Sequence, residues 1–132
     1  MKISSHNEWS PLKSVVVGMA AGANKPDGCH FEHPGAYRSE VTAQADMDLD
    51  RFARTLEQEG VKVYRPKYHN FAPTGGMYNY CPRDRLLVIG NTVVDCNMQY
   101  DCRQQESTYI DFVLKSAKRV VAVPRNRWVK FD

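Results

Sequence analysis

The first half of the chain alternates short apolar runs with polar loops around one longer segment of helical periodicity. The β-branched run SVVVGM, residues 14–19, predicts a strand, and a polar loop containing Gly and Pro follows it to about residue 39. Beyond that loop, apolar residues recur on one helical face: Ala45, Leu49, Phe52, Ala53 and Leu56. Gly60 then stands where a helix C-cap glycine is expected, and the alternation in VKVYR, residues 61–65, predicts a second strand. This half therefore predicts a strand, a helix and a strand.

The second half begins with two apolar runs, RLLVI and TVVDC. They are joined by Gly90-Asn91, a two-residue hairpin signal. A helix is predicted next from apolar residues that share a face: Tyr109, Phe112, Val113 and Ala117. The run RVVAVP, residues 119–124, predicts a final strand that ends at proline. The order β-α-β followed by β-β-α-β predicts an α/β (α+β) fold, with helices on one side of small mixed sheets.

Composition limits the class of protein. A chain of 132 residues with 42% hydrophobic and 25% charged residues is typical of one globular domain, which we place at residues 1–132. The net charge of +3 does not by itself indicate nucleic acid or a membrane as a partner. No run approaches the roughly 20 apolar residues that span a bilayer, and the first residues contain no signal-peptide core. The four cysteines form no CxxC pair, which favours reduced thiols and a cytoplasmic location.

The end of the chain carries a basic patch without acidic residues between residues 112 and 131. The patch comprises Lys115, Lys118, Arg119, Arg125, Arg127 and Lys130, with Trp128 and Phe131 interleaved. Basic and aromatic residues together can stack on single-stranded nucleic acid, but no nucleic-acid-binding signature accompanies them. We favour the alternative that Lys115, Lys118 and Arg119 offset the dipole in the last turns of the second helix, and that the tail adds an edge strand.

Residues 74–91, TGGMYNYCPRDRLLVIGN, place a segment rich in Gly, Tyr and Pro directly before a buried strand. Four stretches of the chain, NEWSPLKSVVVG, YRP, TGGMY and PRDRLLVIGN, occur in the order and spacing found in glycine amidinotransferases. From residue 7 to about residue 124 the chain resembles the N-terminal part of these enzymes and of the related bacterial amidinotransferases of the pentein superfamily. The resemblance implies a partial pentein fold of roughly two ββαβ-type modules, taken from a ring around a central guanidino site.

The resemblance also implies a site. Asp84, the aspartate of the PRD motif, matches the family residue that helps to hold the substrate guanidinium, and a carboxylate suits the planar donors of a guanidinium. Thr74, Gly75 and Gly76 would form a tight loop that brings backbone near the ligand, and Met98 would line the same pocket. The alternative for these motifs is a surface ion pair and an ordinary turn.

Catalysis by this chain alone is not expected. The family uses a cysteine nucleophile, a histidine and an acidic partner, and these lie in later modules that this sequence does not contain. Cys81 adjoins the PRD motif, and Cys96 and Cys102 flank Met98, but no histidine follows residue 69 to activate a thiol. We therefore assign no catalytic residue.

Metal and cofactor binding are not expected either. The segment CHFEH contains four residue types that bind metals, Cys29, His30, Glu32 and His33, but its spacing matches no established zinc pattern. Solvated side chains in a polar loop are the favoured alternative, so we predict no metal and no cofactor.

These observations leave three functional hypotheses. The first is an amidinotransferase-like protein that binds arginine or another guanidino compound and is inactive alone. The second is a subunit of a split amidinotransferase completed by a separate catalytic chain, and the third is an interaction protein without chemistry. Because a partial ring leaves sheet edges and apolar faces uncovered, we also predict a homodimer or a higher closed oligomer.

Overall fold

The computed structural model describes residues 1–23, 37–70, 80–99 and 103–125. The chain divides into two compact units, one of residues 12–81 and one of residues 1–11 together with 82–132. Each unit is described by itself below. The assignment of residues 1–132 to a single domain stays a prediction.

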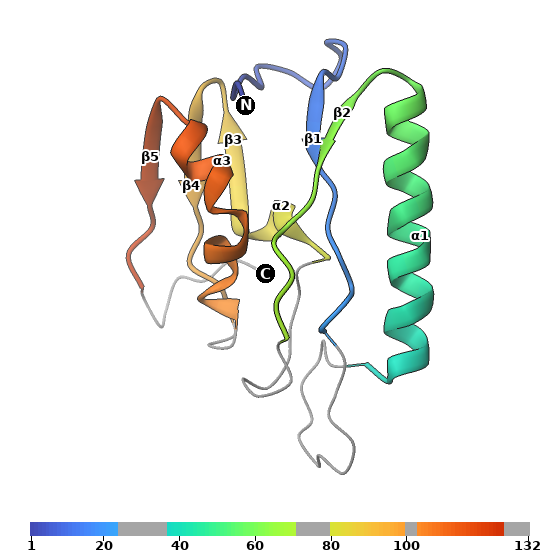
Figure 1. The fold of residues 1–132 in the computed structure, drawn as a ribbon. Coiled ribbons are helices and arrows are strands. Elements are labelled where there is room, and N and C mark those ends of the chain that lie inside the picture. The colour runs from blue at the N-terminus through green and yellow to red at the C-terminus, as the bar shows by residue number, and fades with distance from the viewer. Residues whose placement is uncertain (24–36, 71–79, 100–102, 126–132) are drawn as a thin grey trace. The chain divides into compact units, whose positions relative to one another are not determined.

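In the unit of residues 12–81, the described residues form two strands and one long helix. Strands β1 (Ser14–Val16) and β2 (Lys62–Tyr64) pair in parallel, and helix α1 (Ser39–Gln58) lies between them in the sequence and packs along β2 (Figure 1). Two parallel neighbours need a long crossover, and the segment between these two strands contains helix α1. The predicted strand, helix and strand are confirmed, although both strands are shorter than the apolar runs that predicted them.

Helix α1 ends as the sequence predicted. Gly60 has φ +78° and donates to the Glu57 carbonyl, while the Val61 amide donates to the Leu56 carbonyl at 2.9 Å. These bonds satisfy carbonyls at the helix end in the manner of a glycine C-cap. The predicted apolar face is only partly covered, because Ala53 is buried whereas Phe52 is 54% exposed.

Two contacts hold the strand ends of this unit in place. Arg65, just after β2, donates through Nη1 to Asp50 of α1 at 2.7 Å and through Nη2 to the Gly18 carbonyl at 2.9 Å. Gly18 itself lies against Tyr80, and a Cβ at this position would overlap the Tyr80 backbone. Close backbone approach therefore requires glycine at position 18.

The second unit is built on a three-stranded mixed sheet. Strands β3 (Leu86–Ile89) and β4 (Thr92–Asp95) form an antiparallel hairpin, and β5 (Arg119–Ala122) pairs in parallel with β4 (Figure 1). Gly90 in the two-residue turn has φ +61°, as hairpins of this kind require. The predicted hairpin and final strand are confirmed, and the sheet order is β3-β4-β5.

The described residues of this unit also form three helical segments. The sequence predicted one helix, and the structure divides it into a 3₁₀ helix η3 (Glu106–Ile110) followed by helix α3 (Asp111–Ser116). A short helix α2 (Pro82–Arg85), which the sequence pattern did not predict, leads directly into β3. Val93 of β4 is fully buried, and Ile110 and Val113 of the helical segments are buried as well.

One prediction about the basic patch is wrong. Helix α3 ends at Ser116, so Lys118 lies beyond it and Arg119 is the first residue of β5. Only Lys115 lies in the last turn of the helix, where it pairs with Asp111. Ala117 has an extended backbone, which ends the helix earlier than the spacing of apolar residues suggested.

The fold class is confirmed as mixed α/β with small sheets. Within the described ranges, no helix has both the length and the apolar character needed to cross a bilayer.

Candidate functional site

The PRD motif forms helix α2 and places Asp84 beside the guanidinium of Arg103. Oδ2 of Asp84 accepts hydrogen bonds from both Nη1 and Nη2 of Arg103, each at 3.3 Å. Oδ1 lies 3.7 Å from Nε of Arg83, whose side chain is 92% exposed. The Asp84 side chain itself retains 22% exposure, so one oxygen is held from inside and the carboxylate still reaches solvent.

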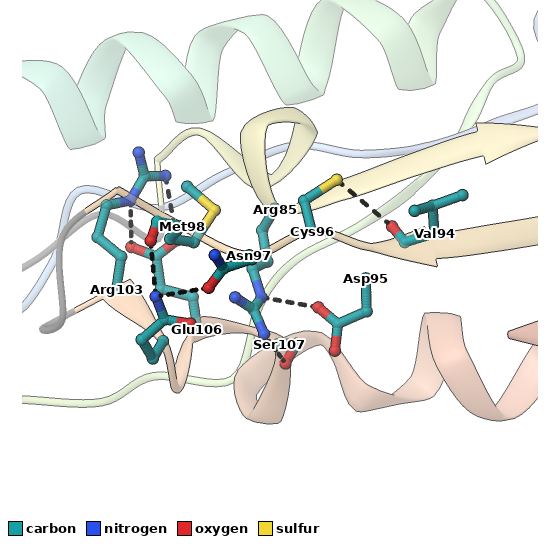
Figure 2. Close-up of polar contacts among 10 residues, drawn as sticks. Arg85, Val94, Asp95, Cys96, Asn97, Met98, Arg103, Glu106 and Ser107 are labelled. Carbon is teal, nitrogen blue, oxygen red and sulfur yellow. Dashed lines mark hydrogen bonds and ion pairs between the residues drawn. The ribbon is translucent and has the colours of Figure 1, made fainter. Parts of the chain in front are cut away.

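Arg103 is held more closely by a second carboxylate, that of Glu106. Its Nε donates to Oε1 of Glu106 at 2.9 Å and its Nη2 donates to Oε2 at 3.1 Å, which makes the pair bidentate (Figure 2). Both side chains are almost completely buried. One buried guanidinium is therefore shared between Glu106 of η3 and Asp84 of α2.

The buried position changes the ionisation of both partners. Burial raises the pKa of Glu106 to about 7, and the hydrogen bond and charge of Arg103 reduce this rise only in part. Burial acts to lower the pKa of Arg103, but its bonds to Glu106 and the charge of Asp84 outweigh burial and raise it. Arg103 stays charged, while Glu106 titrates near neutral pH.

A second buried ion pair lies beside the first. Nε of Arg85 is 2.8 Å from Oδ1 of Asp95, and Nη2 of Arg85 donates to Ser107 at 3.2 Å (Figure 2). The Arg85–Asp95 contact is close but poorly directed for a hydrogen bond, and Nη1 of Arg85 is buried without a partner. The pair connects α2 to the end of β4 and to η3.

The segment after β4 returns to this cluster. The Cys96 amide donates to the Arg85 carbonyl at 2.9 Å. Gln104 donates through Nε2 to the Met98 carbonyl at 2.7 Å and to Asn97 Oδ1 at 3.3 Å. Met98 and Asn97 are both buried, with Met98 at 0% exposure. These hydrogen bonds hold residues 96–98 against Arg85 and Gln104.

The predicted site residues are only partly within the described structure. Asp84 and Met98 are described and belong to the same unit, and their roles in ligand binding stay predictions. The remaining candidates fall outside the described residues: Thr74, Gly75 and Gly76 of the glycine loop, Cys29, His30, Glu32 and His33 of the metal candidate, Cys102, and Arg127, Trp128, Lys130 and Phe131 of the tail.

The described cysteines differ in environment. Cys96 is buried, and burial raises the pKa of its thiol, with a smaller contribution from Asp95 in the same direction. Cys81 is half-buried, directly before α2. A raised pKa disfavours the thiolate, which is the form that attacks carbon, so Cys96 does not have the environment of an activated nucleophile.

Sequence reasoning indicated no site role for the residues around Asp84, among them Arg85, Asp95, Arg103, Glu106 and Ser107. The i, i+3 spacing of Arg103 and Glu106 is a signal in principle, but such a pair is usually an exposed helix ion pair of small effect. Nothing in the spacing indicates burial, because burial depends on long-range contacts such as those of Arg103 with Asp84 of α2.

No family model matches the chain, but several curated amidinotransferases are similar to it over most of its length. Inosamine-phosphate amidinotransferase 1 of Streptomyces griseus is 34% identical over 95% of this chain and 44% of its own length. L-arginine:L-lysine amidinotransferase of Pseudomonas savastanoi pv. phaseolicola is 32% identical, over 86% of this chain and 38% of its own length. The mitochondrial glycine amidinotransferase of Xenopus tropicalis is 31% identical over 76% of this chain and 29% of its own length.

The chain is a homologue of the amidinotransferases. Among solved structures, a Microseira wollei amidinotransferase of the saxitoxin biosynthetic pathway aligns with a TM-score of 0.77 at 32% identity, covering 95% of this chain and 42% of the other. The Streptomyces griseus inosamine-phosphate amidinotransferase aligns with a TM-score of 0.76 at 30% identity, covering 95% and 44%. The resemblance to the N-terminal part of amidinotransferases and to their pentein fold is thereby confirmed, and the chain spans less than half the length of these relatives.

Proposed function

We propose that this amidinotransferase homologue binds a guanidino compound such as arginine at Asp84, and that it does not transfer amidino groups alone. The observation that carries the proposal is the state of the Asp84 carboxylate. One of its oxygens already accepts from a guanidinium, that of Arg103, while the side chain keeps 22% exposure for a second one. The name L-arginine:L-lysine amidinotransferase, given to a relative, supports arginine as the first ligand to test.

We propose that the chain alone does not transfer amidino groups because of the environment of the Cys96 thiol, which lies in the same unit as Asp84. Cys96 is buried and has a raised pKa, which is the opposite of what a nucleophile needs. Substrate binding by a carboxylate positions a guanidinium but does not supply the attacking group. The proposed role is therefore ligand binding, with catalysis left to residues that this sequence does not contain.

Calorimetric titration with arginine tests the proposal. The intact chain should bind weakly, because a ligand at a partly exposed carboxylate is screened by water. Asp84→Asn should abolish the heat of binding. Asp111→Asn removes another carboxylate of the same unit, one that pairs with Lys115 on α3, and should leave binding unchanged. No heat at millimolar arginine, or binding that survives Asp84→Asn, would remove Asp84 from the site.

A second candidate role is assembly with another chain. All four residues of β5 are exposed, and in the described structure β5 pairs on one side only, with β4. Leu87, Ile89 and Val121 lie on the same face of this sheet, and they are 48%, 60% and 36% exposed. Apolar residues on an uncovered sheet edge and face favour association.

We propose a homodimer or higher closed oligomer as the first form of this assembly, with a separate catalytic chain or a purely structural partner as alternatives. Light scattering distinguishes self-association from a monomer of 15.1 kDa. Mixing the chain with candidate partners, and measuring ornithine formation from arginine, then distinguishes a split enzyme from an interaction protein. A cytoplasmic location stays a proposal.

A further inference from the structure

We propose that Arg103 and Glu106 are positioning residues that decide how much of the Asp84 charge is available to a guanidinium ligand. The inference rests on the proposed binding of a guanidino compound at Asp84. It goes further because it assigns roles to two residues that need not touch the ligand, and because it predicts a pH dependence for binding.

The geometry shows an unequal sharing of one guanidinium. Arg103 bonds to Glu106 at 2.9 and 3.1 Å through two separate oxygens, whereas its two contacts with Asp84 are 3.3 Å each and fall on one oxygen. Glu106 is therefore the principal partner of Arg103. Asp84 is oriented by the weaker contact, which leaves Oδ1 turned toward the exposed side chain of Arg83.

The net charge of the cluster depends on the ionisation of its two carboxyl groups. Arg103 carries one positive charge, and Glu106 and Asp84 together carry two negative charges when both are ionised. The adjacent Arg85 and Asp95 neutralise each other. Arg83 lies 3.7 Å from Oδ1 of Asp84, but its side chain is 92% exposed and its charge is screened by water. Apart from Arg83, the cluster has one uncompensated negative charge, located on the partly exposed Asp84, and a guanidinium ligand would take the place of Arg83 and balance it.

Protonation of Glu106 changes this balance. The groups that face it are Arg103 from the turn before η3, and Asp84 and Arg85 from α2. When Glu106 is neutral, Asp84 alone balances Arg103, and no net negative charge remains for a ligand. A cationic ligand should bind more tightly when Glu106 is ionised. By thermodynamic linkage, binding of that ligand must then promote release of the proton from Glu106. Because burial brings the pKa of Glu106 to about 7, this exchange falls near neutral pH.

The experiment is calorimetric titration of the intact chain with methylguanidinium, which has no group that titrates between pH 6 and 8. If only ionised Glu106 supports binding, affinity should fall by about tenfold from pH 8 to pH 6. At pH 7, titration in two buffers of different ionisation enthalpy should show release of about half a proton per ligand bound. Glu106→Gln, which is permanently neutral, should bind at both pH values more weakly than the intact chain does at pH 6, because about a tenth of the intact chain still has Glu106 ionised there.

Glu59→Gln is the matched control, since Glu59 is an exposed residue at the end of α1. It should keep the pH profile of the unchanged sequence. Proton release is measured on the unchanged sequence, so the test stands even if Glu106→Gln does not fold, which circular dichroism would reveal.

The outcomes separate this inference from the proposed function. Binding that depends on Asp84 but is independent of pH and releases no proton would overturn the positioning role and leave the guanidino site intact. A Glu106→Gln chain that is folded and binds as tightly as the unchanged sequence at pH 8 would do the same. No binding of methylguanidinium at pH 8, or binding unaffected by Asp84→Asn, would overturn both.

Discussion

Arg85 and Asp95 face each other at the open end of the β3–β4 hairpin, with Nε of the arginine 2.8 Å from Oδ1 of the aspartate. Their side chains are only 8% and 17% exposed, so both charges have been removed from most of their water. The geometry is not ideal, because Nη1 of Arg85 has no partner. In a buried ion pair each charge compensates the other, so removing one residue leaves a buried charge without compensation and destabilises the fold.

The first prediction follows from that imbalance. Asp95→Leu should lower the free energy of unfolding by about 3 kcal/mol, because Arg85 stays buried without the carboxylate it pairs with and keeps its hydrogen bond to Ser107. The double variant Arg85→Met, Asp95→Leu should recover most of the loss, since no unpaired charge remains. Urea denaturation of both variants measures the difference. As a control, Asp111→Asn breaks an exposed ion pair and should lower the free energy of unfolding by less than about 1 kcal/mol. A double variant that is no more stable than Asp95→Leu would contradict this explanation.

The second prediction concerns stability and pH. The folded-state pKa of Glu106 is about 7, above the ordinary value of 4.5, so the folded protein binds the proton more tightly than the unfolded chain. The stabilising contribution of this group is therefore complete below about pH 4.5 and is lost as pH rises through 7. Over that range it amounts to something on the order of 3 kcal/mol.

The measurement is the free energy of unfolding from pH 4.5 to 8 for the unchanged sequence and for Glu106→Gln. Other carboxyl groups titrate in both proteins, so the difference between the two curves isolates Glu106. That difference should slope across the range, whereas the difference with Glu59→Gln should be flat. Parallel curves for Glu106→Gln would mean that Glu106 titrates normally.

The third prediction tests the uncovered strand β5. Val120 is 45% exposed, and a lysine there would place a charge on the strand that we propose for association. Val120→Lys should convert an oligomer into a monomer by light scattering at micromolar concentration. Val41→Lys, at a 48% exposed position of α1, serves as the control and should leave the assembly unchanged. If the unchanged chain is already a monomer, the assembly proposal is wrong.

The fourth prediction concerns turnover. The isolated chain should produce no ornithine from arginine above background, and Cys96→Ser should not alter that result, because the buried thiol has a raised pKa. Activity that disappears with Cys96→Ser would show that the thiol is activated in spite of its burial. The substitution should lower stability only modestly, since serine is close to cysteine in size.

The order of elements was predictable because it depends on local signals. Gly60 marked the end of α1 and Gly90 marked the hairpin, and in both cases the glycine has the positive φ that the signal implies. The boundaries were less predictable. Lys118 and Arg119 were assigned to a helix that ends at Ser116, because the apolar spacing continued past the point where Ala117 becomes extended.

Only the part of the site that belongs to a sequence motif was predictable. Asp84 was found through the PRD motif, but its partner Arg103 was not, because the contact joins segments separated by the whole hairpin. The same holds for Glu106, whose altered pKa results from burial that no spacing of residues reveals. Periodicity gives neighbours along the chain, whereas long-range packing decides which charges meet.

The parallel pairing of β1 with β2 has a consequence for the route by which the chain folds. The β3–β4 hairpin closes through a two-residue turn, so its strands meet with little loss of chain entropy. Ser14 can pair with Lys62 only after the intervening loop has been drawn in and α1 has formed. Non-local pairings of this kind slow folding, so the hairpin should form early and the parallel pair late. Contacts that form late leave their mark chiefly on the unfolding rate, so changes in β1 or β2 should shorten the lifetime of the native state more than they delay its formation.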